Sequence, residues 1–474
     1  MINIALGKYK LRLAKDTPIE RIEISNYGQL NEMLYEKWLY SKSVLLFENK
    51  CSNEYYLTVP VYSTISLYIK DDCITDDISL LADVSDISEN ALKQLVAYTF
   101  ICSPTTLFNT VKKLPRWSCF HIKGDNYSFE PISIAKISRE AELKNVLNDC
   151  FQIEEYNSKS LLAYSGGLDS TLLYHSLKDK LKDYALYSIF VIGGRDESYY
   201  QKIGVPQHEI VTKSIMTEKD VQEALKSTTD GYELFGCSIA LKYDFMFKDV
   251  KRKEYKSIIT GDGPDDIFIC QKTLDRFVDV EKAQLLPLNN NTECDMIDLP
   301  VFKEDISNPW YWYNFILMAE SNYYFERVYA KKNNVSLITP FLNPKLLAYC
   351  AEISQKIYGM TEKQLLKEYC QGIVHDEIIN RRKMGFTSDV ALWFKKNGVL
   401  YTIAKNLIAQ SYKLPYGNQL KKELSELLKE HAKSEYDPNA STGGKGVLNQ
   451  LYVEMLVLYW LYKMENGKDI ECDF

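Results

Sequence analysis

The sequence predicts an α/β protein of two domains: a β-rich α+β domain over residues 1–137, and a domain over residues 138–474 whose parallel sheet is flanked by helices. Short alternating apolar runs such as Tyr55–Val61 fill the first part and are typical of strands. In the second part, the apolar runs Ser160–Tyr164 and Ala185–Ile192 flank a stretch whose leucines recur at helical spacing. This strand–helix–strand order indicates a parallel pair, because a helical crossover returns the chain to the same end of the sheet.

Composition is that of a globular protein and argues against two kinds of partner. The chain has 474 residues, of which 46% are hydrophobic and 26% charged, so it can bury a substantial core. A net charge of −7 gives no reason to expect binding to nucleic acid. The most apolar stretch, Val447–Met464, contains Asn449, Gln450 and Glu454, so it predicts a buried helix rather than a membrane span. We therefore expect no nucleic-acid partner and no membrane partner.

The cysteines and the first residues predict a cytoplasmic location. Eleven cysteines are scattered without a Cys-x-x-Cys pair, which fits a reducing compartment better than a disulfide framework or a zinc site. The stretch Met1–Ile4 has no basic region followed by an apolar one, so no signal peptide is expected.

The second domain is organised around Ser165–Ser170, which follows a predicted strand and opens a predicted helix. Its two glycines let backbone N–H groups approach an anion, and the first helical turn adds free N–H groups and the positive end of the helix dipole. No Gly-Lys-Ser/Thr follows, so this is not a Walker loop. The carboxylate of Asp169 fits beside anionic phosphates only if Mg²⁺ lies between them. The stretch therefore favours a nucleotide phosphate site over an ordinary glycine-rich turn.

A second stretch, Ser257–Phe268, runs from an apolar strand into a turn that carries Asp262, Asp265 and Asp266. Three neighbouring carboxylates repel one another unless a cation or water separates them. Ligands bind at the carboxyl ends of parallel strands, where Asp169 would also lie. The shared edge favours a Mg²⁺ site over a solvated acidic turn.

The first stretch resembles the pyrophosphate loop (PP-loop) of the ATP pyrophosphatase superfamily, and both stretches resemble the synthetase domain of class B asparagine synthetases. The resemblance implies ATP and Mg²⁺ as cofactors, and a reaction in which a carboxylate is adenylated and an amine then displaces AMP. It implies Asp169 and Asp265 as metal ligands and places Asp262 in the position of the family's catalytic Glu. The residues implied to bind the nucleotide are Tyr164, Ser165, Gly166, Gly167, Asp169, Ser170, Ile189 and Gly261.

Two basic segments, one beginning at Lys363 and the other spanning Arg381–Phe386, also resemble segments of this family. A fixed cation stabilises the charge that builds on the α-phosphate during the reaction. Lys383 is predicted to have this catalytic role, with support from Lys363 and Arg381. Glu320, on a predicted helix, is a candidate for orienting a catalytic group, and a surface position on that helix is the alternative.

The segments Pro104–Phe108 and Lys113–Pro115 resemble the glutaminase-like (Ntn-type) domain that precedes the synthetase domain in this family. Such glutaminases use an N-terminal cysteine whose thiol attacks and whose amine acts as the base. The chain begins Met1-Ile2, and its first cysteine is Cys51. We therefore expect a degenerate domain that does not hydrolyse glutamine and that has a structural role or helps to hold the substrate.

These resemblances imply an ATP-dependent carbon–nitrogen ligase. Within this family the chain resembles lasso peptide macrolactam synthetases best among the branches considered; these join a peptide's N-terminal amine to an internal Asp or Glu side chain. The implied partners are a peptide or small-molecule substrate with a carboxylate and an amine, a leader-peptide protease and a precursor-binding protein. The alternatives are a ligase that uses ammonia or a separate amine, a β-lactam synthetase, a tRNA-modifying pyrophosphatase and a non-catalytic peptide-binding homologue. Asp262 argues against the β-lactam branch, which has a tyrosine at this position.

Overall fold

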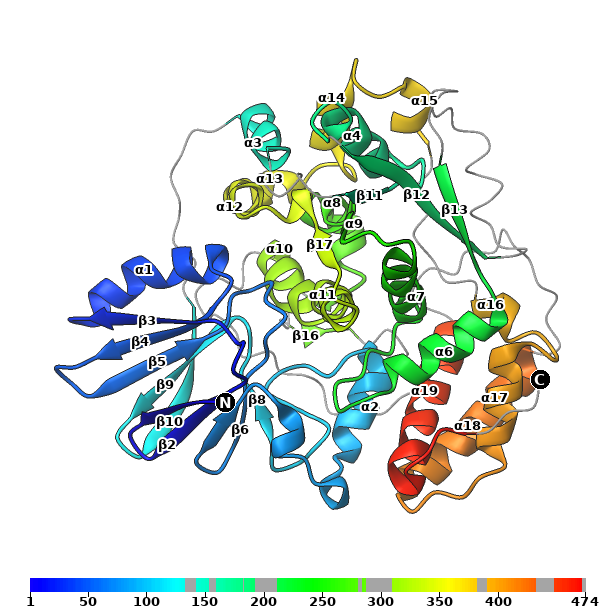
Figure 1. The fold of residues 1–474 in the computed structure, drawn as a ribbon, viewed down its shortest axis with the longest axis horizontal. Helices are drawn as coiled ribbons and strands as arrows, with labels where there is room; N and C mark the ends of the chain where they lie inside the picture. The colour runs from blue at the N-terminus through cyan, green and yellow to red at the C-terminus, as the bar shows by residue number, and fades with distance from the viewer. Residues whose placement is uncertain are drawn as a thin grey trace.

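The computed structural model has a β-rich part and a parallel-sheet part on either side of a central group of helices (Figure 1). The residues that it describes are 1–132, 142–152, 159–181, 183–191, 211–279, 284–286, 309–381, 390–431 and 447–470. The predicted boundary between residues 137 and 138 lies outside them.

The N-terminal part contains two five-stranded sheets, with strand orders β1-β2-β7-β6-β8 and β10-β9-β5-β4-β3. Apolar side chains from both sheets, including Leu11, Leu57 and Phe120, form one buried cluster, so the sheets pack face to face. The predicted β-rich character of the N-terminal part is confirmed. Its strands are β1 Ile2–Leu6, β2 Tyr9–Leu13, β3 Ile19–Ile24, β4 Val44–Asn49, β5 Glu54–Thr58, β6 Tyr68–Lys70, β7 Cys73–Thr75, β8 Lys112–Lys113, β9 Ser118–Lys123 and β10 Asn126–Pro131.

Two helices complete this part. Helix α1 (Tyr27–Tyr40) lies along β3 and β4 of the second sheet (Figure 1). Helix α2 (Glu89–Tyr98) begins where the Ser88 hydroxyl accepts a hydrogen bond from the N–H of Ala91 and ends at Thr99, whose φ is 69°. Short 3₁₀ turns lie at η1 Ile78–Leu80 and η2 Val84–Asp86.

The second domain contains a five-stranded sheet of order β13-β12-β11-β14-β17, in which every neighbouring pair is parallel. The predicted parallel sheet is confirmed. Because β11 lies between β12 and β14, the turns that follow β11 and β14 meet at one edge of the sheet. The strands are β11 Ser160–Ala163, β12 Tyr184–Val191, β13 Val211–Met216, β14 Ser257–Ile259 and β17 Ser336–Ile338, with a small antiparallel pair at β15 Val278–Asp279 and β16 Gln284–Leu285.

Helices flank this sheet (Figure 1). Helix α4 ends at Leu177, earlier than the leucine repeat suggests, and Leu181 is buried beyond its end. The helices are α3 Leu143–Cys150, α4 Leu168–Leu177, α6 Glu218–Thr228, α7 Ile239–Arg252, α8 Pro264–Ile267, α9 Gln271–Leu274, α10 Pro309–Tyr311, the π-helix η4 Trp312–Met318, α11 Asn322–Lys332, the 3₁₀ turn η5 Pro340–Leu342, α12 Pro344–Glu352, α13 Ser354–Tyr358, α14 Gln364–Cys370 and α15 Asp376–Ile379.

The C-terminal helices form a layer of their own and contact the N-terminal domain. They are α16 Val390–Trp393, α17 Val399–Ile408, α18 Pro415–His431 and α19 Val447–Asn466. The predicted buried helix is confirmed as α19, which packs on α18 and on α2 and is buried throughout residues 451–461. Among the residues that the structure describes, no helix combines the length and the apolar character that crossing a bilayer requires.

Candidate active site

The turn from β11 into α4 forms an anion cradle at the carboxyl edge of the sheet. Gly166 has a φ of 69°, and Gly167 is the N-cap of α4. The N–H of Ser165 donates to the Ser170 hydroxyl at 3.2 Å, and that hydroxyl donates to the Gly167 carbonyl at 3.2 Å. These bonds hold the turn so that the N-terminus of a ten-residue helix opens at the edge. The predicted strand–turn–helix is confirmed, and phosphate binding by it stays a prediction.

The two acidic stretches meet at Gly261. A Cβ atom at this position would lie 3.3 Å from the backbone nitrogen of Ser170 and 3.4 Å from the Cβ of Asp169. Glycine therefore lets the end of β14 pack directly against the first turn of α4. The expectation that the turns after these two strands share one edge is confirmed.

Lys363 connects the two predicted metal ligands. Its Nζ lies 2.5 Å from Oδ2 of Asp169 and forms an ion pair with Oδ1 of Asp265. The residue is the N-cap of α14, with a φ of 54°, and its N–H donates to the Phe268 carbonyl at 3.3 Å. Burial lowers the pKa of Lys363, but the two carboxylates outweigh burial and hold the pKa above its usual value. The ammonium therefore stays charged between the two acids.

The donor set fits a magnesium ion that is bound together with phosphates. Mg²⁺ is usually held by one or two carboxylates, waters and substrate phosphate oxygens rather than by a cage of protein ligands. Asp169 and Asp265 supply two carboxylates beside the cradle. Within the described ranges, no group of three or more His, Cys, Asp or Glu side chains is arranged to hold a metal ion. The two aspartates would hold Mg²⁺, and phosphates would complete its coordination.

Asp262 is paired with Glu326, an acid for which the sequence gives no local signal. Glu326 lies on α11 and is fully buried. Burial raises the pKa of Glu326 well above its usual value, and the adjacent Asp262 carboxylate raises it further. Asp262 is only partly buried. The two carboxyl groups therefore form a pair in which burial favours the protonated form of Glu326 and Asp262 is the more exposed member.

Asp266 has a different environment from its neighbours in the turn. The hydroxyls of Tyr313 and Tyr323 donate to its two carboxylate oxygens, the first at 2.9 Å. The side-chain amide of Asn314 donates to its carbonyl at 3.1 Å. Side chains of η4 and α11 thus fix the position of Asp266, and through Asp266 they hold the acidic turn against these two helices.

The other predicted nucleotide residues lie on the strands beside the cradle. Tyr164 is buried, and its N–H donates to the Tyr187 carbonyl at 2.8 Å. Ile189 is buried on β12. The guanidinium Nη2 of Arg381 lies 3.8 Å from the position that a Cβ of Gly167 would take, so Arg381 reaches the cradle. Lys383 lies outside the described residues, and its catalytic role stays a prediction.

A protein-family model described as asparagine synthase matches residues 160–292 and 326–443, which together are more than half of the chain. The chain belongs to the asparagine synthase family. It is 20% identical over 436 residues to the Bacillus subtilis (strain 168) protein named asparagine synthetase [glutamine-hydrolyzing] 1. That alignment covers 74% of this chain and 66% of the relative, so the chain spans just under two thirds of the relative's length.

The asparagine synthase match includes the cradle, the acidic turn after β14 and Lys363, but it excludes Glu320. Glu320 is 1% exposed, so the alternative of a surface helix position is wrong. Its Oε2 accepts a hydrogen bond from the Ser103 hydroxyl at 2.7 Å, and its Oε1 accepts one from the N–H of Arg116 at 3.1 Å. Both donors belong to the N-terminal domain. These contacts give Glu320 a structural role between the domains, and an orienting role in catalysis stays a prediction.

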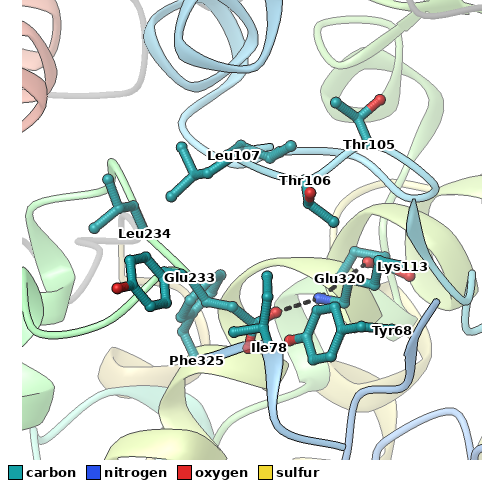
Figure 2. A pocket seen from close by; sticks show the side chains of 12 residues that line it. Tyr68, Ile78, Thr105, Thr106, Leu107, Lys113, Glu233, Leu234, Glu320 and Phe325 are labelled. Atoms are coloured by element: carbon teal, nitrogen blue, oxygen red, sulfur yellow. Dashed lines mark hydrogen bonds and ion pairs between the residues drawn. The ribbon is translucent and has the colours of Figure 1, made fainter. Parts of the chain in front are cut away.

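Charged groups of both domains meet at one place in the interface of this asparagine synthase family member, beside apolar contacts such as that of Trp38 with Phe315. Figure 2 shows Lys113 of the N-terminal domain between Glu233 and Glu320, with Nζ to carboxylate distances of 2.8 and 3.8 Å. The cavity that they line has a volume of about 20 Å³, enough for about one water molecule. Residues of both domains surround it, including Tyr68 and Phe325. This part of the interface therefore combines ionic contacts and a small cavity with a hydrophobic core that spans both domains.

Proposed function

We propose that this chain is an ATP-dependent, AMP-forming amide-bond ligase, which activates a substrate carboxylate and joins it to an amine. The observation that carries the proposal is the convergence of Asp169, Asp265 and Lys363 beside the Ser165–Ser170 cradle. Membership of the asparagine synthase family supports it.

The chain's own groups bind the nucleotide and stabilise charge in this proposal. Asp169 and Asp265 hold Mg²⁺, and the N–H groups at the start of α4 hold the phosphates. Mg²⁺–ATP, when bound, supplies the phosphoanhydride whose cleavage activates the carboxylate. Lys363, Arg381 and Lys383 supply fixed positive charge where negative charge develops.

The pair of Asp262 and Glu326 is suited to the amine step. An ammonium group must lose a proton before its nitrogen can form an amide bond. Asp262 is half-buried and follows β14 at the edge of the sheet, and we propose it as the acceptor for that proton. Glu326, whose pKa is raised by burial and by Asp262, keeps its own proton behind it. A half-buried carboxyl group and a buried protonated one thus supply a proposed base and a hydrogen-bond donor.

For the substrate we propose a peptide that carries both groups, so that the product is a macrolactam of the lasso type. The sequence resemblance supports this. A leader-peptide protease and a precursor-binding protein would then act with it. The name of the Bacillus subtilis relative favours a second candidate, aspartate amidation with free ammonia.

Product analysis tests the proposal and separates the two candidates. Purified protein is incubated with Mg²⁺ and ATP, and with either a library of linear peptides or aspartate plus ammonium. Nucleotides are separated by chromatography, and the loss of water from a peptide is followed by mass spectrometry. We expect AMP and pyrophosphate to form together with the amide, and both to form about 10²–10³-fold more slowly with Asp169→Asn. ADP as the sole nucleotide product during turnover would contradict the proposal.

A further inference from the structure

The carboxylate pair at the cradle already contains a cation that belongs to the protein. Lys363 contacts one oxygen of Asp169 and one of Asp265, so the three groups carry a net charge of −1 instead of −2. The Lys363 side chain is 7% exposed, whereas the side chains of Asp169 and Asp265 are 20% and 36% exposed. The ammonium therefore lies on the protein side of the pair, and the carboxylates face solvent.

The backbone fixes this ammonium in place. Lys363 adopts the left-handed conformation at the start of α14, and its N–H donates to the Phe268 carbonyl. Its own carbonyl accepts a hydrogen bond from the N–H of Lys367 at 2.9 Å, the first bond of the helix. Such a position is uncommon for a residue with a side chain, and the surrounding structure must determine it.

This arrangement weakens the pair as a site for a free metal ion. Half of the negative charge that would attract a divalent cation is neutralised, and one oxygen of each carboxylate is in use. Mg²⁺ gives up its water shell reluctantly, so a site of net charge −1 is expected to bind the free ion only weakly. Nucleotide phosphates bring several further negative charges and oxygen ligands.

We propose that Lys363 keeps the Asp169 and Asp265 pair from binding a divalent cation alone, so that the cation enters only together with nucleotide phosphates. The inference rests on the proposed function for the role of the nucleotide. It makes Lys363 a residue that determines the order of ligand entry, in addition to the positive charge that it supplies.

Manganese binding tests this without any need for the substrate. Mn²⁺ is titrated into the full chain without nucleotide, and free Mn²⁺ is measured by electron paramagnetic resonance. We expect Lys363→Met to bind Mn²⁺ at least about tenfold more tightly than the unchanged protein, because both carboxylates regain their charge. The matched control is Lys367→Met, which removes the same charge one turn along α14 and should bind like the unchanged protein. Equal Mn²⁺ affinity in Lys363→Met and the unchanged protein would overturn the inference, as would equal gains in both variants.

A second arm of the titration adds α,β-methylene-ATP, which cannot be cleaved at the bond that the proposed reaction breaks. We expect the unchanged protein to bind Mn²⁺ tightly only in its presence. If the unchanged protein binds neither this analogue nor Mn²⁺ with it, the proposed function fails. The comparison of Mn²⁺ affinity between Lys363→Met and the unchanged protein without nucleotide still tests the inference about Lys363. Tight Mn²⁺ binding by the unchanged protein without nucleotide refutes the inference alone.

A thermal measurement covers the case in which Lys363→Met is poorly folded. Lys363→Gln keeps a hydrogen-bond donor without the charge and is the second variant. Circular dichroism is recorded with and without Mn²⁺ for both variants. We expect Mn²⁺ to raise the melting temperature of the variants and to leave that of the unchanged protein in place, because a bound ion stabilises only the folded state. No Mn²⁺-dependent shift in Lys363→Gln would count against the inference.

Discussion

Two buried lysines of this protein make similar contacts and have different surroundings. Lys113 lies between Glu233 and Glu320 at the domain interface, and Lys363 lies between two aspartates at the cradle. For both lysines, burial lowers the pKa, and the neighbouring acids outweigh it and raise the pKa above the usual value. The local chemistry of one cation between two carboxylates is therefore the same.

The difference lies in what else the carboxylates contact. At the interface, Ser103 and Arg116 donate to Glu320, and the Tyr324 hydroxyl donates to Glu233. The Tyr324 ring also lies 4.5 Å from the Lys113 ammonium. At the cradle, one carboxylate side chain is 36% exposed and can meet a ligand. The two triads therefore differ in Glu320, whose side chain is fully enclosed, whereas Glu233 and both aspartates of the cradle have side chains that are 20–36% exposed. An acid that reaches solvent can meet a ligand, and an enclosed acid cannot.

The largest expected effect separates the two lysines by stability. Lys113→Met leaves the fully enclosed Glu320 carboxylate without its cation, and breaking a buried ion pair in this way typically costs about 3–5 kcal/mol. Lys363→Met should cost less, because its acids can recover water. Denaturant unfolding checks both variants, with Lys112→Met, an exposed neighbour on β8, as the control. Equal losses from the two buried lysines would contradict the comparison.

The next prediction concerns the activity of the cradle. Asp169→Asn removes a charge from the proposed metal ligands, and a loss of about 10²–10³ in turnover is expected, in the range of other lost electrostatic contacts. The fold should survive, because Asp169 is partly exposed. Turnover is measured as AMP formation with the substrate that product analysis identifies, beside Asp179→Asn, an exposed acid after α4. Near-normal turnover in Asp169→Asn would remove it from the site.

A smaller effect concerns the acid pair that has no lysine. Glu326→Gln keeps the hydrogen-bond donor behind Asp262 and removes the ability to titrate, so a loss of about tenfold is expected, below the usual range for direct proton transfer. Glu326→Leu removes the donor as well and should cost about 10². The rate of amide formation is compared with the rate of ATP–pyrophosphate exchange, which should change little. A larger loss in the exchange than in amide formation would assign Glu326 to nucleotide binding instead.

The smallest effect concerns Glu454, a buried acid on α19 whose Oε1 accepts a hydrogen bond from Gln450 at 2.8 Å. Burial raises the pKa of Glu454 to about 8. Between its unfolded value and this folded value, the folded protein holds a proton that the unfolded chain has lost, so stability falls as the pH rises through that window. Glu454→Gln should flatten this fall and add on the order of 1–2 kcal/mol at pH 8. Parallel pH–stability curves for the two proteins would show that Glu454 does not titrate in the window.

Local sequence determined the elements that build the edge of the site. The glycines and serines of Ser165–Ser170 determine the conformation of this turn. The strand and the helix on either side follow from apolar periodicity. The parallel sheet follows from the order of these elements. Asp169 and Asp265 were predictable as neighbours for the same reason, since each follows a strand and the two strands adjoin.

Only the tertiary structure decided which charges lie together. Lys363 meets Asp169 across 194 positions of the chain, and Glu320 meets Ser103 across 217. Glu326 and Glu320 look alike in sequence, as acids on or beside helices, yet one pairs with Asp262 and the other with the N-terminal domain. The physical reason is that backbone conformation depends on neighbours in sequence, whereas the role of a charged side chain depends on its burial and its partners, which folding alone brings together.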